Sequence, residues 1–196
     1  MSAQLFSDSQ ILIAGVDEVG RGCLFGPVVA AAVVFEKAAI SQLAEIGVKD
    51  SQQLSATRRE LLTTEIKNRA ISYYISYASS QEIDRLNILN ASLLAMQRSV
   101  TKLSGSPQLC LVDGNKKIPN LTIAQETSLG GDKSSPIIAD ASILAKVWRD
   151  QLIIRLAVKY PHYDLENNKG YGTKQHRLAL QEYGPCFHHR HSFKRK

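Results

Sequence analysis

The sequence predicts an α/β domain built on a mixed β-sheet with helices on its faces. Two apolar, β-compatible runs, 10–17 and 28–35, follow one another with no helix between them, which favours antiparallel pairing. Later strand candidates are separated by helical segments, which favours parallel pairing. A length of 196 residues suits one compact domain, residues 1–196.

The first half of the chain is punctuated by turn and capping residues. A glycine-rich segment, 17–27, joins the first two strands, and a weak helix is predicted to close at 43–47. Ser55 is placed to cap a stronger helix, in which apolar residues recur at helical spacing. Tyrosines alternate along 71–78, which predicts a third strand.

The second half is predicted to hold two short strands and four helices. Ser80 and Asn90 are the expected caps of the first two helices. The longest helix is expected to begin at Ser135-Pro136, because proline fits the first helical turn. The remaining expected elements are strands at 108–112 and 121–125, the end of the long helix near Tyr160, and a last helix at 174–183.

Composition narrows the function classes. The net charge of +6 favours a polyanionic partner. The longest apolar run, 28–35, is too short to span a bilayer, and residues 1–10 show no secretory signal. Three widely spaced cysteines without zinc-ligand spacing indicate reduced thiols in a cytoplasmic protein. The basic tail around Arg190 is either a disordered solubilising end or a phosphate contact.

Carboxylates at the ends of apolar strands are the clearest chemical signal. Asp17 and Glu18 end the first strand, where a buried carboxylate needs a partner such as a divalent cation. Alternatively, Asp17 caps a turn and Glu18 faces solvent. Adjacent strand residues point to opposite faces, so both can serve one site only if the strand twists or ends there.

Two further aspartates lie where they could join that site. Asp113 ends another apolar strand, although Asp113-Gly114 also suits a turn. Asp132 precedes the long helix, where it could instead compensate the positive helix end. Asp140, inside that helix, is interpreted as a residue of its polar face or as one that compensates the helix dipole, not as a catalytic residue. Several carboxylates around two Mg²⁺ or Mn²⁺ ions are the usual design for phosphodiester hydrolysis.

Candidate substrate contacts follow in the long helix and the loop after it. Ser142, Lys146 and Arg149 share a helix face and could contact phosphates. Lys146 could equally pair with Asp150 four residues later. Tyr171 lies between two glycines, where its ring could stack on a sugar or base, or simply pack on the surface.

These residues lie in motifs that together resemble ribonuclease HII. The similar blocks run in one order from residue 15 to the tail and cover nearly the whole chain. They are DEVGRG at 17–22 with GPVV at 26–29, KDS at 49–51, VDGN at 112–115, GD at 131–132, ASILAKV at 141–147 with RD at 149–150, KGY at 169–171, and HRHSF at 189–193.

The resemblance implies an RNase H-like fold with a five-stranded mixed sheet, helices on its faces and a small helical C-terminal extension over about 161–196. It implies an endonuclease, active as a monomer, that cuts RNA–DNA hybrids and cuts 5′ of single ribonucleotides in duplex DNA during replication and ribonucleotide excision repair. Products would carry a 3′-hydroxyl and a 5′-phosphate. The implied catalytic and metal-binding residues, with two Mn²⁺ or Mg²⁺ ions, are Asp17, Glu18, Asp113 and Asp132.

The resemblance also implies how the substrate is recognised. The main chain of Gly20, Arg21 and Gly22 would contact the 2′-hydroxyl, the group that distinguishes RNA from DNA. Tyr171 would stack on the adjacent deoxyribose. Arg190 belongs to the similar tail motif and is expected to bind substrate. The chain departs from the family pattern at Gln52, Cys23–Phe25, Asp140 and Trp148.

Two other function classes account for fewer of these residues. A dinucleotide-binding oxidoreductase would need a helix directly after Gly20-x-Gly22, whereas Pro27 and a valine-rich strand follow. A non-catalytic RNA–DNA binding module suits the basic charge and Tyr171. It gives no reason for carboxylates at strand ends, because these would repel phosphates without a metal.

Overall fold

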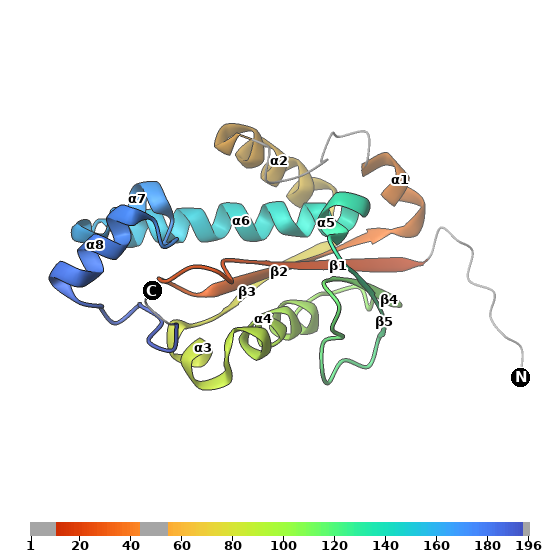
Figure 1. Cartoon of the computed structure of the whole chain (residues 1–196). Coiled ribbons are helices and arrows are strands. Elements are labelled where there is room, and N and C mark those ends of the chain that lie inside the picture. The colour runs from red at the N-terminus through yellow and green to blue at the C-terminus, as the bar shows by residue number, and fades with distance from the viewer. Residues whose placement is uncertain (1–10, 44–54, 194–196) are drawn as a thin grey trace, which may run out of the picture.

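A five-stranded sheet with the strand order β3-β2-β1-β4-β5 forms the centre of the molecule (Figure 1). The computed structural model describes residues 11–43 and 55–193. The strands are β1 (Leu12–Val19), β2 (Val28–Glu36), β3 (Ser72–Ala78), β4 (Leu109–Asp113) and β5 (Ala124–Ser128). This confirms the mixed five-stranded sheet that the sequence predicts.

Strand direction follows the connections. β1, β2 and β3 follow one another with antiparallel pairing. β1 pairs in parallel with β4, and β4 in parallel with β5. The register sets Val16 of β1 opposite Val112 of β4. The next residue on each strand is an aspartate, so the parallel pairing brings Asp17 and Asp113 to the same edge of the sheet.

Helices cover both faces of the sheet (Figure 1). One face carries α6 with α2 beside it, and the opposite face carries α4 with α3. The helices of these two layers are α2 (Ala56–Arg69), α3 (Ser80–Leu86), α4 (Ile88–Thr101) and α6 (Pro136–Ala157), and the short α5 (Gly131–Ser134) directly precedes α6. The others are α1 (Ile40–Leu43), α7 (Leu165–Asn168), α8 (Lys174–Tyr183) and the 3-10 turns at Lys37–Ala39 and Pro161–Tyr163.

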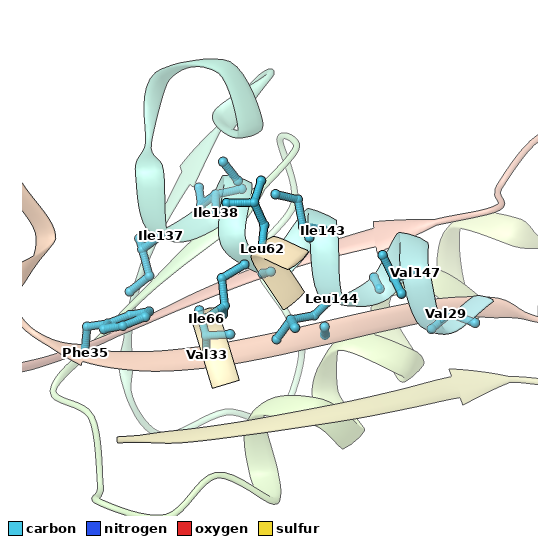
Figure 2. Close-up of a cluster of buried hydrophobic side chains, with 14 of the residues drawn as sticks. Val29, Val33, Phe35, Leu62, Ile66, Ile137, Ile138, Ile143, Leu144 and Val147 are labelled. Carbon is cyan, nitrogen blue, oxygen red and sulfur yellow. The ribbon is translucent and has the colours of Figure 1, made fainter. Parts of the chain in front are cut away.

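Each face of the sheet has its own apolar core. Figure 2 shows the core under α6, where Val33 and Phe35 of β2 meet Ile137 and Leu144 of α6 and Leu62 of α2. A second core lies on the other face, between the sheet and α4. Because β2 is buried on both sides, its sequence is an unbroken apolar run rather than an alternating one.

Several element boundaries differ from the sequence prediction. The two helices predicted from Ser80 and Asn90 are capped instead by Ser79 and Asn87. Ser79 forms a reciprocal capping box with Glu82, which fixes that start. The strand predicted at 121–125 lies at Ala124–Ser128, in register with β4. The predicted helix end at 43–47 and Gln52 lie largely outside the described residues.

The C-terminal segment packs against the domain. Phe25, Ile153, Tyr163 and Leu180 form a third apolar cluster that joins α6, α8 and the glycine-rich segment. The tail up to residue 193 runs back along this cluster, so the interpretation of a disordered basic end is wrong for the described tail residues. In the described part of the chain, no helix has the length and apolarity to cross a membrane.

Asp140 corrects a sequence interpretation. It was assigned to a polar helix face, but it is fully buried between α6 and α2. Neither carboxylate oxygen has a hydrogen-bond partner among the described residues. Burial, followed by the charge of Glu65, raises its pKa to about 7, against a smaller opposing effect of Arg69. The sequence pattern of α6 did not predict the burial of Asp140, because a charged residue that interrupts an apolar pattern is normally assigned to the exposed face.

Replacing Asp140 by alanine is expected to stabilise the protein most at alkaline pH. The pKa of Asp140 is higher in the folded than in the unfolded protein, so burying its ionised carboxylate lowers the free energy of unfolding. This cost is absent below the pKa of the unfolded chain, grows as the pH rises and is complete above about pH 7. At about 1.4 kcal/mol per pH unit, the gain should be about 2 kcal/mol larger at pH 8 than at pH 5.5. Urea unfolding at both pH values measures this, with exposed Glu60→Ala as control. An equal gain at both pH values would contradict the assignment.

Candidate active site

Three carboxylates converge at one edge of the sheet. Asp17, Glu18 and Asp113 each place a carboxylate oxygen within 4.8 Å of the others, and they are the only such acidic group among the described residues. β1 and β4 are parallel neighbours, so the carboxyl ends of both strands lie at this edge. Asp17 and Glu18 lie at the end of β1, where its pairing with β4 has already stopped, and both side chains reach the group.

The group carries unbalanced negative charge. Burial raises the pKa of Asp17 well above its usual range, and the charges of Glu18 and Asp113 add to this. Burial also raises the pKa of Glu18, although Arg21 opposes it through a 3.0 Å ion pair. The second oxygen of Glu18 is buried without a hydrogen-bond partner in the described structure. These are the properties of a site that binds cations.

Backbone and hydroxyl donors orient Asp17 and Asp113, whereas the Glu18 side chain pairs with Arg21. The Gly131 N–H donates to Asp113 at 2.7 Å, and the Glu18 N–H donates to Asp17 at 2.6 Å. A hydrogen bond with the Ser142 side chain lowers the pKa of Asp17, against the larger effect of burial. Ser142, predicted to contact substrate, therefore contacts a carboxylate of the site.

A cavity of about 500 Å³ opens over the carboxylates. It brings together many of the residues that the sequence singles out, from β1, β4, α5, α6 and the loop before α8. Its lining residues are Asp17, Glu18, Val19, Arg59, Asp113, Asp132, Ser142, Lys146 and Tyr171. Asp132 thus lies in the cavity wall, outside the close group of three.

Arg59 was missed by sequence reasoning. It belongs to the first turn of α2, outside every motif that the sequence singles out, and it lines the same cavity. Its sequence neighbours read as an ordinary charged helix surface, so only the packing of α2 beside α6 places it at the site.

The donor set fits a hard divalent cation. All the converging ligand atoms are carboxylate oxygens, which Mg²⁺ and Mn²⁺ prefer. The unpartnered oxygen of Glu18 and the raised pKa of Asp17 show what such an ion would relieve. The tail histidines lie elsewhere: His189 is buried against Phe25 and Tyr163.

The predicted recognition segment begins with a constrained glycine. Gly20 has φ +90°, and a Cβ there would overlap the Arg149 side chain. Gly22 has no protein atom within 4 Å of its Cβ position, so it faces open space. One glycine is therefore required by the protein itself, and the other leaves room for something outside it.

Arg149 and Arg190 are not exposed as phosphate contacts require. Both are buried, with guanidinium groups that donate to main-chain carbonyls. Arg149 donates to Phe25, Pro27 and Lys169 at 3.0, 3.1 and 2.8 Å. Arg190 donates to the carbonyls of Gly20, Arg21 and Gly26 at 2.7, 2.8 and 3.0 Å. The expected direct contact is thus replaced by a positioning role: the two arginines hold the glycine-rich segment in place.

Lys146 and Tyr171 do face the cavity. Lys146 also pairs with Asp150 at 3.0 Å, which was the alternative interpretation. Its ammonium lies 5.8 Å from the centre of the Tyr171 ring, and that ring is part exposed. Tyr171 is tied to the glycine-rich segment, because the neighbouring Gly170 carbonyl accepts hydrogen bonds from Leu24 and Phe25.

The chain is similar to ribonucleases HII over nearly its whole length. The family model described as Ribonuclease HII matches residues 14–196. The ribonuclease HII of Acaryochloris marina is 59% identical over 95% of this chain and 94% of its own length. That of Synechocystis is 54% identical over 94% of this chain and 97% of its own length.

Two solved structures are similar to this chain in fold. The ribonuclease H2 of Pyrococcus horikoshii matches with a TM-score of 0.81 and 27% identity, over 94% of this chain and 95% of that one. The ribonuclease HII in the PCNA complex from Archaeoglobus fulgidus matches with a TM-score of 0.76 and 28% identity, over 94% and 96%. The sequence matches, with the fold in agreement, show that this chain belongs to the ribonuclease HII family.

Proposed function

We propose that this protein is an endonuclease that cuts the RNA strand of RNA–DNA hybrids and cuts 5′ of single ribonucleotides in duplex DNA. The observation that carries the proposal is one cavity that joins a three-carboxylate group to Tyr171, beside the anchored Gly20–Gly22 segment. Membership of the ribonuclease HII family supports the same reaction.

Each residue then has a separate task. Asp17, Glu18 and Asp113, with Asp132 in the cavity wall, would hold two Mg²⁺ or Mn²⁺ ions. Bound there, such ions activate water and stabilise the leaving 3′-oxygen. The Gly20–Gly22 main chain contacts the 2′-hydroxyl, and the Tyr171 ring packs on the next deoxyribose. Lys146 neutralises a phosphate at the cavity mouth, and Arg149 and Arg190 keep the segment in register.

The direct test is cleavage of an end-labelled DNA duplex that contains one ribonucleotide. We expect a single cut 5′ of that ribonucleotide with Mg²⁺ or Mn²⁺, and none with EDTA. A cut only within long hybrids would keep the nuclease and remove recognition by Gly20–Gly22. Binding without cleavage of either substrate, strengthened by EDTA, would replace the proposal by a non-catalytic binding module.

Lys146→Met should weaken substrate binding and reduce its salt dependence. One lost phosphate contact lowers the slope of log Kd against log salt by roughly 1. Fluorescence anisotropy with a labelled hybrid between 50 and 300 mM KCl, in Ca²⁺, measures the slope. Lys159→Met, at an exposed position, is the matched control and should leave it unchanged. An unaltered slope for Lys146→Met would assign the lysine to Asp150 alone.

The same proposal covers the cellular setting. The enzyme acts as a monomer in the cytoplasm and removes ribonucleotides from newly replicated DNA. One copy of the chain supplies all the residues to which the proposal gives a task at metal or substrate. Light scattering after gel filtration should give a mass near 21.6 kDa.

A further inference from the structure

Two buried histidines join the end of the chain to Tyr171. His176 lies in the first turn of α8, and His189 lies in the segment after that helix. Both side chains are almost fully buried. Their Nε2 atoms are 3.0 Å apart, so one ring must donate a proton to the other.

The outer nitrogens of the two rings fix where the protons are. The Cys186 N–H, which can only donate, lies 3.0 Å from His189 Nδ1. The Tyr171 carbonyl, which can only accept, lies 2.9 Å from His176 Nδ1. His189 must therefore carry its proton on Nε2 and His176 on Nδ1. The result is one directed chain from Cys186 through both rings to Tyr171, with both rings neutral.

The same tail segment also holds the glycine-rich segment. Arg190, the residue after His189, donates to the carbonyls of Gly20 and Arg21. His189 itself forms a β-bridge with Phe25. One short stretch of chain therefore contacts both predicted recognition elements: the Tyr171 loop through histidines and the glycine-rich segment through arginine.

We propose that the His176–His189 pair is a positioning device that sets the Tyr171 loop relative to the Gly20–Gly22 segment, and so sets the fit of the deoxyribose beside a ribonucleotide. The proposal rests on the proposed function of Tyr171 and of that segment. Neither histidine touches the cavity, so the effect is on substrate fit, not on the chemical step.

The arrangement works only while both rings are neutral. A second proton on His176 would place an N–H on each side of the 3.0 Å contact and break it. The neighbours of the pair are the rings of Tyr163 and Phe25, the carboxylate of Asp164 and the cation of Arg190. Burial lowers the pKa of His176 despite the opposing effects of the Tyr171 carbonyl and Asp164, so the ring is neutral at pH 7.

The first test reads the protons in the unaltered protein. Long-range ¹H–¹⁵N NMR of the histidine rings at pH 7.5 should show His176 protonated on Nδ1 and His189 protonated on Nε2. The Nδ1 form is the less common one for histidine, so this is a specific signature. Any other pair of tautomers, or a charged ring, would overturn the chain as assigned.

The second test separates fit from chemistry. His176→Leu should raise KM for a duplex with one ribonucleotide about tenfold and leave kcat within about threefold. His176→Asn keeps a donor for the Tyr171 carbonyl, so its KM should return most of the way to that of the parent protein. Exposed His162→Leu is the matched control and should behave as the parent protein. On lowering the pH from 7.5 to 5.5, KM should rise more for the parent than for His176→Asn.

The outcomes are distinguishable. An active parent enzyme whose KM is unchanged by His176→Leu would reject the positioning role and leave the proposed nuclease standing. A parent protein that cuts no RNA–DNA substrate would reject the proposed function, and the positioning role with it. Equal losses in kcat for the Leu and Asn variants would mean that the histidines serve the fold alone, which also overturns the inference.

Discussion

Asp17→Asn should abolish cleavage and, in the absence of metal, stabilise the protein. Asparagine keeps the shape of the side chain and the acceptor for the Glu18 N–H. It removes a buried charge that lies against Glu18 and Asp113, and burial has already raised the pKa of this carboxyl. Because the folded-state pKa is raised, that charge lowers stability most at alkaline pH. We expect a gain of about 1–2 kcal/mol at pH 8 in EDTA.

With metal bound, the parent protein should become more stable than Asp17→Asn. An ion at 100 times its Kd stabilises the parent by about 2.7 kcal/mol, and the variant binds it more weakly. Thermal unfolding at pH 8, in EDTA and then in Mn²⁺, measures both effects, and single-turnover cleavage should fall by roughly 10³-fold or more. Exposed Glu182→Gln is the control. A variant that stays less stable than its parent in EDTA would mean that Asp17 supports the fold rather than a metal.

Two alanine substitutions should affect different properties of the protein. Gly20→Ala should lower its stability, whereas Gly22→Ala should lower only its activity. At Gly20 the backbone has φ +90°, and the new Cβ would overlap an Arg149 side chain that three carbonyls hold in place. We expect a loss of about 2–3 kcal/mol of stability. At Gly22 the added Cβ meets no protein atom, so stability should change by less than about 0.5 kcal/mol.

Activity should then separate the two glycines. Gly22→Ala should keep the fold and lose about 10²-fold in kcat/KM on a single-ribonucleotide duplex, because the new Cβ would occupy space that the proposed function gives to the substrate. Gly20→Ala should lose activity together with stability. Urea unfolding and cleavage kinetics on the two variants give the comparison. Full activity in Gly22→Ala would place the 2′-hydroxyl contact elsewhere.

The carboxylates could be predicted from the sequence because their position has a local cause. Apolar strands that end in Asp17 and Asp113 need no knowledge of distant packing, and parallel neighbours share an edge. The sheet type followed from the order of strands and helices for the same reason. Glu18 joins the same group because the β1–β4 pairing ends just before it. The sequence showed that the strand would have to twist or end there, but it could not show that it does.

The buried arginines could not be predicted in this way. A cation in a long helix or a basic tail is usually exposed, so Arg149 and Arg190 were expected on the substrate. Five of their six carbonyl partners belong to a segment that lies more than 120 residues away in sequence. Asp140 was misread for the same reason: its burial depends on where α2 packs. Positions that are decided by contacts between distant segments leave little trace in the local pattern.

The arginine anchor also has a consequence for the order of folding. Arg190 Nη2 bonds the carbonyl of Gly20, which precedes it by 170 residues. Closing so long a loop is slow, and synthesis runs from the N-terminus at about 5–20 residues per second. The strands that carry Asp17 and Asp113 can therefore pair on the ribosome before Arg190 has been made. A nascent chain would possess the carboxylates some seconds before the segment beside them is held, so under the proposed function substrate selection would be the last property that the protein acquires.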